Sequence, residues 1–159
     1  MTAILTGGCA CESIRYECSE EPIVQIICHC RDCQRASGSA FAPGMFVAAD
    51  KFRYLKSTPT FHEVVAQSGR LVQRGFCGKC GSFIGVRWPA DPQVVVISPI
   101  SLDDPSRFQP TAEVWLSRAQ AWHPVHPDTT KFKGPPLTGV KDKVDEYFAK
   151  RAGYPNAMS

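Results

Sequence analysis

Short runs of β-forming residues recur about every ten positions along the chain, and Pro, Gly, Asp and Ser interrupt them. Such regular spacing of short segments is typical of a sandwich or an open barrel and predicts a mainly β fold. The predicted strands cover residues 13–17, 23–27, 41–47, 61–66, 71–76, 83–87, 94–98 and 113–116.

Helical patterns are scarce. A short helix is predicted over residues 31–37, ending at Gly38, because glycine readily adopts the left-handed conformation that caps a helix. A second helix is predicted over 140–151, where Val140, Val144, Tyr147 and Phe148 share one helical face. Residues 122–136 contain four prolines and should form an irregular connection that wraps the sheet.

Length and composition predict one globular domain. The 159 residues are 43% hydrophobic and 21% charged, which is enough to bury a core over residues 1–159. No run approaches the roughly 20 apolar residues of a membrane span, and no signal peptide is visible at the N-terminus. We therefore expect a cytoplasmic protein without a membrane partner.

Seven of the eight cysteines fall into three spacings that suit metal ligands. Structural zinc sites are closed by four protein ligands, whereas a catalytic zinc keeps three and leaves one position for water or substrate. Seven thiols therefore indicate one zinc of each kind. The spacings are Cys9-x-Cys11, Cys28-His29-Cys30-x-x-Cys33 and Cys77-x-x-Cys80, and Cys18, which fits none of them, is interpreted as a free thiol.

The first and last spacings form half-sites. Cys77-Gly-Lys-Cys80-Gly81 is a tight knuckle, and Cys9-x-Cys11 follows Gly7 and Gly8, which allow the backbone to turn around an ion. The two pairs are the natural halves of a four-cysteine site, although spacing alone does not reveal which distant knuckles meet. Disulfides are the alternative, but such close spacings suit a metal better than an unstrained disulfide.

The middle triplet lies where a predicted strand ends and the short helix begins. Cys33, near the helix start, and the cations Arg31 and Arg35 favour thiolate there. Ligands within six residues would hold an ion from one side only. A histidine fourth ligand stays open as an alternative: His29 should point away from its neighbours, and the distant histidines are expected on the surface or in loops, namely His62, His123 and His126.

The net charge argues against a nucleic-acid partner. The formal charge of +3 counts cysteines as neutral. Seven thiolates and two Zn²⁺ ions would together contribute −3, which brings the zinc-loaded protein close to zero. A basic footprint for phosphate binding is therefore not expected.

The order and spacing of these motifs resemble the glutathione-dependent formaldehyde-activating enzyme family, also called centromere-protein-V-like. The resemblance covers about residues 7–122, and residues 123–159 carry no motif of it. It rests on Gly7-Gly8-Cys9-x-Cys11-x-x-Ile14-x-Tyr16, on Cys28-His29-Cys30-x-x-Cys33-Gln34-x-x-Ser37-Gly38 and on Phe76-Cys77-x-x-Cys80-Gly81-Ser82.

The resemblance implies a fold, two zinc ions and an activity. The fold would be the β-rich zinc domain shared with a Rab exchange factor and with methionine-R-sulfoxide reductases. The activity would be a carbon–sulfur lyase run in reverse, in which glutathione adds to formaldehyde. A structural zinc would lie on Cys9, Cys11, Cys77 and Cys80, and a catalytic zinc on Cys28, Cys30 and Cys33.

Three points stay open at the level of the sequence. Glu12 stands where the family commonly has glycine, so the local turn could differ. A sulfoxide reductase would need a reactive cysteine on a late strand, and none follows Cys80. A zinc-braced protein-binding module without catalysis remains an alternative, and no spacing selects which arginines would hold the carboxylates of glutathione among Arg31, Arg35, Arg70, Arg74 and Arg87.

Overall fold

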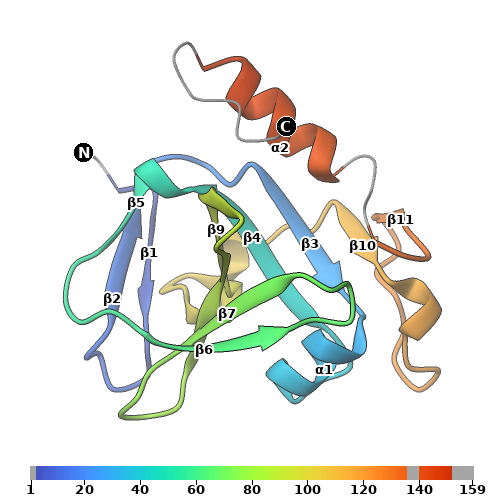
Figure 1. Ribbon diagram of the computed structural model, residues 1–159, viewed down its shortest axis with the longest axis horizontal. Helices are drawn as coiled ribbons and strands as arrows, with labels where there is room; N and C mark the ends of the chain where they lie inside the picture. The colour runs from blue at the N-terminus through green and yellow to red at the C-terminus, as the bar shows by residue number, and fades with distance from the viewer. Residues whose placement is uncertain (1–2, 136–139, 152–159) are drawn as a thin grey trace.

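Two β-sheets make up the body of the protein in the computed structural model, which describes residues 3–135 and 140–151 (Figure 1). The small sheet is antiparallel, with strand order β1-β2-β5. Its strands are β1 (Leu5–Gly8), β2 (Arg15–Cys18) and β5 (Phe52–Tyr54).

The large sheet has eight strands in the order β11-β10-β3-β4-β9-β8-β7-β6. Its neighbours are antiparallel except that β10 runs parallel to both β3 and β11. The strands are β3 (Val24–Cys28), β4 (Ala42–Ala48), β6 (Thr60–Val65), β7 (Leu71–Phe76), β8 (Phe83–Trp88), β9 (Asp91–Ile97), β10 (Ala112–Val114) and β11 (Thr130–Lys131).

The prediction of a mainly β fold is confirmed. Each predicted strand corresponds to an observed one, within a few residues at its ends. Strand β10 stops two residues early because Trp115 has φ 60°, a left-handed backbone that cannot continue a strand. Sequence patterns missed β1, β5 and β11, and β11 lies inside the connection predicted to be irregular.

Two α-helices are present among the described residues, α1 (Arg31–Ser37) and α2 (Val140–Ala149). The first has the predicted bounds and ends at Gly38, with φ 66°. The second starts as predicted and ends two residues early. Neither of these helices is long and apolar enough to cross a membrane. Short 3₁₀ turns connect strands at Ala49–Lys51, Pro99–Ser101, Pro105–Arg107 and Leu116–Arg118.

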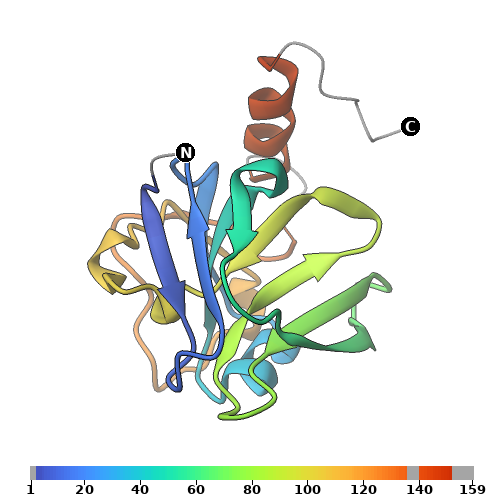
Figure 2. The same cartoon turned by 90° about the vertical axis from the view of Figure 1, so that its left-hand side faces the viewer.

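The central strands of the large sheet are buried on both faces. Along β4, Met45 and Val47 point into a core shared with the small sheet, while Phe46 and Ala48 point into a second core. This follows from the alternation of side chains along a strand. The second core is closed by α2, the red helix in Figures 1 and 2, through Val140, Val144 and Phe148.

Strand β1 lies very close to its neighbour β2 and to the turn after β9 at Gly7. A Cβ atom on Gly7 would lie 2.4 Å from both the Tyr16 hydroxyl and the carbonyl oxygen of Ser101. Tyr16 is fully buried, and its hydroxyl lies 2.7 Å from Ser101 Oγ. A glycine is therefore needed at this strand position for space rather than for a turn.

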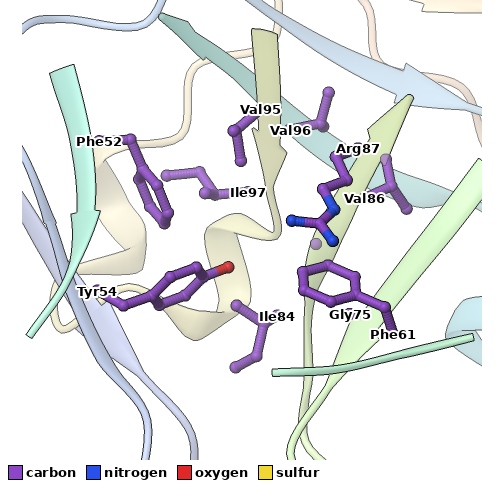
Figure 3. Close-up of a pocket in the computed structure, with 11 residues that line it drawn as sticks. Phe52, Tyr54, Phe61, Gly75, Ile84, Val86, Arg87, Val95, Val96 and Ile97 are labelled. Atoms are coloured by element: carbon purple, nitrogen blue, oxygen red, sulfur yellow. The ribbon is translucent and has the colours of Figure 1, made fainter. Parts of the chain in front are cut away.

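A small apolar hollow of about 60 Å³ lies where β5 faces strands β6 to β9 (Figure 3). The Arg87 guanidinium lies 3.7 Å from the centroid of the Phe61 ring, and the Tyr54 hydroxyl points toward the middle of the hollow. Burial raises the pKa of Tyr54 to about 12, so this phenol stays protonated at neutral pH. No cysteine lines the hollow, which separates it from the thiol clusters described below.

Candidate metal centres

Four cysteine sulfurs gather where the two sheets meet at their turns. The Sγ atoms of Cys9, Cys11, Cys77 and Cys80 all lie within 4.8 Å of one another. Two of these separations are 3.5 Å for Cys9–Cys11 and 3.7 Å for Cys11–Cys77. Four sulfurs arranged tetrahedrally at about 2.3 Å from a zinc ion would lie about 3.8 Å apart, so the cluster fits such an ion.

Polar groups around this cluster stabilise thiolate. Ser13 Oγ lies 3.1 Å from the sulfur of Cys11 and 3.3 Å from that of Cys77. Ile14 N–H donates to the sulfur of Cys9 over 3.3 Å. Hydrogen bonds from the side chain and backbone of Ser82 lower the pKa of Cys80 to about 5. The pKa values of Cys9 and Cys80 are thus shifted toward the deprotonated form that a metal requires.

The turn that carries Cys9 and Cys11 has a strained residue. Glu12 has φ 59°, a left-handed conformation that glycine adopts easily and glutamate does not. We expected Gly7 and Gly8 to provide the sharp turn, and this expectation was wrong because both residues lie in β1. The reversal occurs at Glu12, whose N–H donates to the carbonyl oxygen of Cys9 over 3.0 Å.

Three further sulfurs form a second cluster at the end of β3. The Sγ atoms of Cys28, Cys30 and Cys33 lie within 4.8 Å of one another. Cys28 is the last residue of β3, and Cys30 caps α1 by accepting a hydrogen bond from the N–H of Cys33 over 3.3 Å. The strand end and the helix start therefore place three thiols on one small turn.

Hydrogen bonds among the three thiols lower the pKa of Cys30 and raise that of the other two. Hydrogen bonds from the Cys28 and Cys33 side chains lower the pKa of Cys30 to about 2. The same interaction with Cys30 raises the pKa of Cys28 to about 12, and hydrogen bonds with both neighbouring sulfurs raise the pKa of Cys33. A divalent cation would stabilise the thiolate form of three sulfurs placed this close together.

Within residues 3–135 and 140–151, no histidine, carboxylate or further cysteine joins this trio to make a fourth ligand. His29 lies between two of the thiols in sequence but points away from them. His62 is exposed, and His123 packs its ring against Phe41, with centroids 5.0 Å apart. His126 Nδ1 accepts from the N–H of Asp128. The three-sulfur cluster thus has three protein ligands among the described residues.

His29 forms a fully buried pair with Glu113. The side chains are 2% and 0% exposed, and His29 Nε2 lies 2.7 Å from Glu113 Oε2. The other carboxylate oxygen, Oε1, accepts from the N–H of His126 and the hydroxyl of Thr129, while Lys131 Nζ lies 3.9 Å away. Burial raises the pKa of Glu113, but these hydrogen bonds outweigh it and hold the pKa below its usual range.

The backbone of the same turn is held by Gln34. Its Nε2 donates to the carbonyl oxygen of His29 over 2.6 Å and to that of Arg118 over 2.9 Å. The side chain of His29 and its carbonyl are thus anchored separately, the first to β10 and the second to α1. Such outer contacts fix the orientation of neighbouring ligands and tune their metal affinity.

Sequence reasoning missed three residues around the clusters. Ser13 and Gln34 carry no local signal of their role. Glu113 did carry one, because a carboxylate between Ala112 and Val114 stands inside an apolar strand, and a buried charge requires partners. Glu113 could therefore have been recognised from the sequence as a buried carboxylate with partners.

Cys18 belongs to neither cluster. It is fully buried in the core between the sheets, and its thiol donates to the carbonyl oxygen of Glu20 over 3.3 Å. Burial raises its pKa, so it stays a protonated thiol. Cys18 is a free thiol, as its spacing predicts, and it ends strand β2 with its side chain facing inward.

Comparisons with known proteins agree with the cysteine motifs. A crystal structure of a Rhodobacter sphaeroides protein has a similar fold, with TM-score 0.50 and 14% sequence identity, over 80% of this chain and 98% of that one. No curated protein matches the chain. The model of the family described as glutathione-dependent formaldehyde-activating enzyme matches residues 4–118. Since this match spans most of the chain, the protein belongs to the glutathione-dependent formaldehyde-activating enzyme family.

Proposed function

We propose that the protein is a zinc-dependent enzyme of the carbon–sulfur lyase type that joins glutathione to formaldehyde. The family supports these two substrates. The observation that carries the proposal is the cluster of Cys28, Cys30 and Cys33, to which the described residues add no fourth ligand. We propose that this cluster holds the catalytic zinc and that Cys9, Cys11, Cys77 and Cys80 hold a structural one.

The placement of the clusters supports this division. The four-sulfur cluster joins the β1–β2 turn of one sheet to the β7–β8 turn of the other, so it ties together segments more than 60 positions apart. The three-sulfur cluster is local, because its ligands lie within six residues. A metal in the first cluster would therefore hold the fold, while one in the second would leave the fold nearly unaffected.

The addition of glutathione to formaldehyde mainly requires a thiolate held beside the aldehyde. Zinc held by Cys28, Cys30 and Cys33 would supply a position at which a thiol is deprotonated near neutral pH. The glutathione sulfur then attacks the formaldehyde carbon, a carbon–sulfur bond forms, and the carbonyl electron pair moves to oxygen, which takes up a proton. The product is S-hydroxymethylglutathione, and no oxidant or reductant is needed.

The chain's own residues would orient this step. Glu113 and Gln34 hold the turn between Cys28 and Cys30 from two directions. A rigid turn keeps the three sulfurs on one side, so that the remaining position stays open for a thiol. Fixed geometry of this kind is how a site lowers a barrier by positioning.

Cobalt substitution tests the proposal. In the protein loaded with cobalt, 2-mercaptoethanol and glutathione should both change the visible bands of the three-cysteine centre. Cys30→Ser should abolish this change and return the condensation of glutathione with formaldehyde to its uncatalysed rate. An unchanged spectrum with either thiol, together with an unaltered rate in Cys30→Ser, would replace the enzyme with a zinc-braced binding module.

A further inference from the structure

A hollow of about 230 Å³ opens beside the first turns of α1. Arg31, Gln34 and Arg35 line it from the helix, with Ser39 beyond the helix end. Gln120 and Trp122 close it from the segment after β10, and the Trp122 side chain is 72% exposed.

The lining of the hollow is cationic and polar. It contains two guanidinium groups and no carboxylate. Neither Arg31 nor Arg35 forms an ion pair with any acidic side chain of residues 3–135 and 140–151. Guanidinium groups bind carboxylates through paired hydrogen bonds, so two unpaired ones beside carboxamides and a hydroxyl suit an anionic ligand with further polar groups.

The hollow is built on a fixed frame. Gln34 is 4% exposed, and its Oε1 accepts hydrogen bonds from Arg31 and, over 2.9 Å, from Gln120. Its Nε2 is the donor that holds the carbonyl oxygen of His29. One buried side chain thus joins the hollow to the turn that carries Cys28 and Cys30, and it positions Arg31 before any ligand arrives.

The distance from the thiols suits a short peptide. Gln34 follows Cys30 by four residues, which places both on the same side of the helix. Arg35 lies five positions after Cys30, or roughly 7.5 Å along the helix axis. An extended tripeptide spans roughly 10 Å, so a thiol in its middle could reach the sulfur cluster while a terminal carboxylate reaches the arginines.

We propose that this hollow binds a carboxylate of the thiol substrate, with Arg31 and Arg35 as its ligands and the exposed face of Trp122 as a wall. The proposal rests on the proposed function for the identity of the thiol. On this proposal, the hollow distinguishes a peptide thiol, which has carboxylates, from a small neutral thiol. A neutral thiol such as 2-mercaptoethanol has no group for these arginines.

S-methylglutathione tests the hollow without using the metal, because it keeps both carboxylates and cannot form a thiolate. It should bind the zinc-loaded protein at millimolar concentration, as measured by calorimetry, and should change the fluorescence of Trp122. The fluorescence change should disappear in Trp122→Phe. Arg35→Ala and Arg31→Ala should each weaken binding by about tenfold, since each removes a charge-assisted contact.

Arg53→Ala is the matched control, because it removes the same charge from β5 in the small sheet and should leave the affinity unchanged. Arg35→Lys should recover part of the loss, because lysine keeps the charge but not the paired hydrogen bonds. Arg35 has an exposed side chain, so its variants should fold even if Arg31→Ala, which removes a contact of Gln34, does not. Binding that is absent in the wild type or unchanged in Arg35→Ala would overturn the proposal.

The two proposals fail in different ways. If 2-mercaptoethanol changes the cobalt spectrum equally in wild type and Arg35→Ala while glutathione binds the variant about tenfold more weakly, both proposals hold. If neither thiol changes the spectrum, the lyase proposal fails. The binding of S-methylglutathione then still shows whether the hollow binds a carboxylate. If glutathione binds both proteins equally, the hollow is not the carboxylate site.

Discussion

Glu113 Oε2 lies 2.7 Å from His29 Nε2, and both side chains are buried. The pairing of β3 with β10 explains the contact, because Glu113 is the register partner of Ile27, two positions before His29. The pair therefore links the cysteine turn to the sheet through side chains as well as through the backbone.

Glu113→Ala should lower the free energy of unfolding by about 3 kcal/mol, because it leaves buried donors without an acceptor. It should also weaken the metal of the Cys28 cluster by about tenfold to a hundredfold, as loss of an outer contact does, measured by chelator competition. Glu17→Gln, which removes a charge paired with Arg53 on the small sheet, is the control and should change neither quantity appreciably. Equal effects on both metal centres would show that the pair supports only the general fold.

Cys77→Ser should yield unfolded or insoluble protein, whereas Cys30→Ser should fold and hold about half the metal. Cys77 is buried in the core between the sheets, and a structural zinc contributes roughly 10–16 kcal/mol of apparent binding free energy. Circular dichroism and metal analysis of the two variants provide the measurement. Equal solubility with equal metal loss would contradict the division into structural and catalytic centres.

Cys18→Ser should cost about 1–3 kcal/mol in a urea titration while both metal equivalents remain, because it places a hydroxyl in an apolar core. Cys18→Ala should cost less, since alanine brings no polar atom. In the native protein the Cys18 thiol should resist alkylation, consistent with its burial and raised pKa. Loss of metal in Cys18→Ser would mean that the cysteine count of four plus three is incorrect.

Glu12→Gly should raise the free energy of unfolding by about 1 kcal/mol, because glycine adopts φ 59° without the steric cost that glutamate carries. Glu12→Ala separates backbone from charge: it removes the carboxylate beside the four thiols but keeps a Cβ atom. We expect Glu12→Ala to be less stable than Glu12→Gly. If the alanine variant gains as much stability, the carboxylate and not the backbone is responsible.

Asp103 makes stability depend on pH through Arg15, whose two terminal nitrogens lie 2.8 and 2.5 Å from its carboxylate oxygens. Hydrogen bonds from Arg15 and Thr6 lower the pKa of Asp103 in the folded protein. The stabilisation is therefore present above the unfolded pKa of about 3.9 and is lost as the pH falls through the lower folded value. Because the pair is partly exposed, Asp103→Asn should cost at most about 1 kcal/mol at pH 7, and the difference from wild type should shrink toward pH 3.

The local parts of the fold could be predicted from the sequence. Helix α1 has the predicted bounds, since Gly38 and the cysteine cap are encoded within ten residues. Strand β1 was missed because it consists of Leu-Thr-Gly-Gly, and two glycines weaken any strand pattern. Glycine is required at position 7 because the ring of Tyr16, on the neighbouring strand β2, leaves no space for a side chain. The sequence of β1 alone does not show this.

The relationships between distant segments could be predicted only in part. Cysteine spacing indicated two groups of thiols, and the structure brings Cys9 and Cys11 to Cys77 and Cys80. The hollow beside α1 could not be foreseen, because Gln120 and Trp122 reach it from 80 or more positions away. Arginine spacing alone carries no information on which of the five candidate arginines face a common space.

Helix α1 bears one ligand of the three-sulfur cluster and is capped by another, and it carries three of the residues that line the neighbouring hollow. If both proposals hold, a stretch of about a dozen residues encodes both the reactive centre and the choice of thiol. Exchanging Arg31 and Arg35 for other side chains would let the same scaffold serve differently charged thiols with its sulfur atoms untouched. Changes of thiol specificity can therefore be confined to this single turn. The strands and the four-sulfur cluster would stay unchanged.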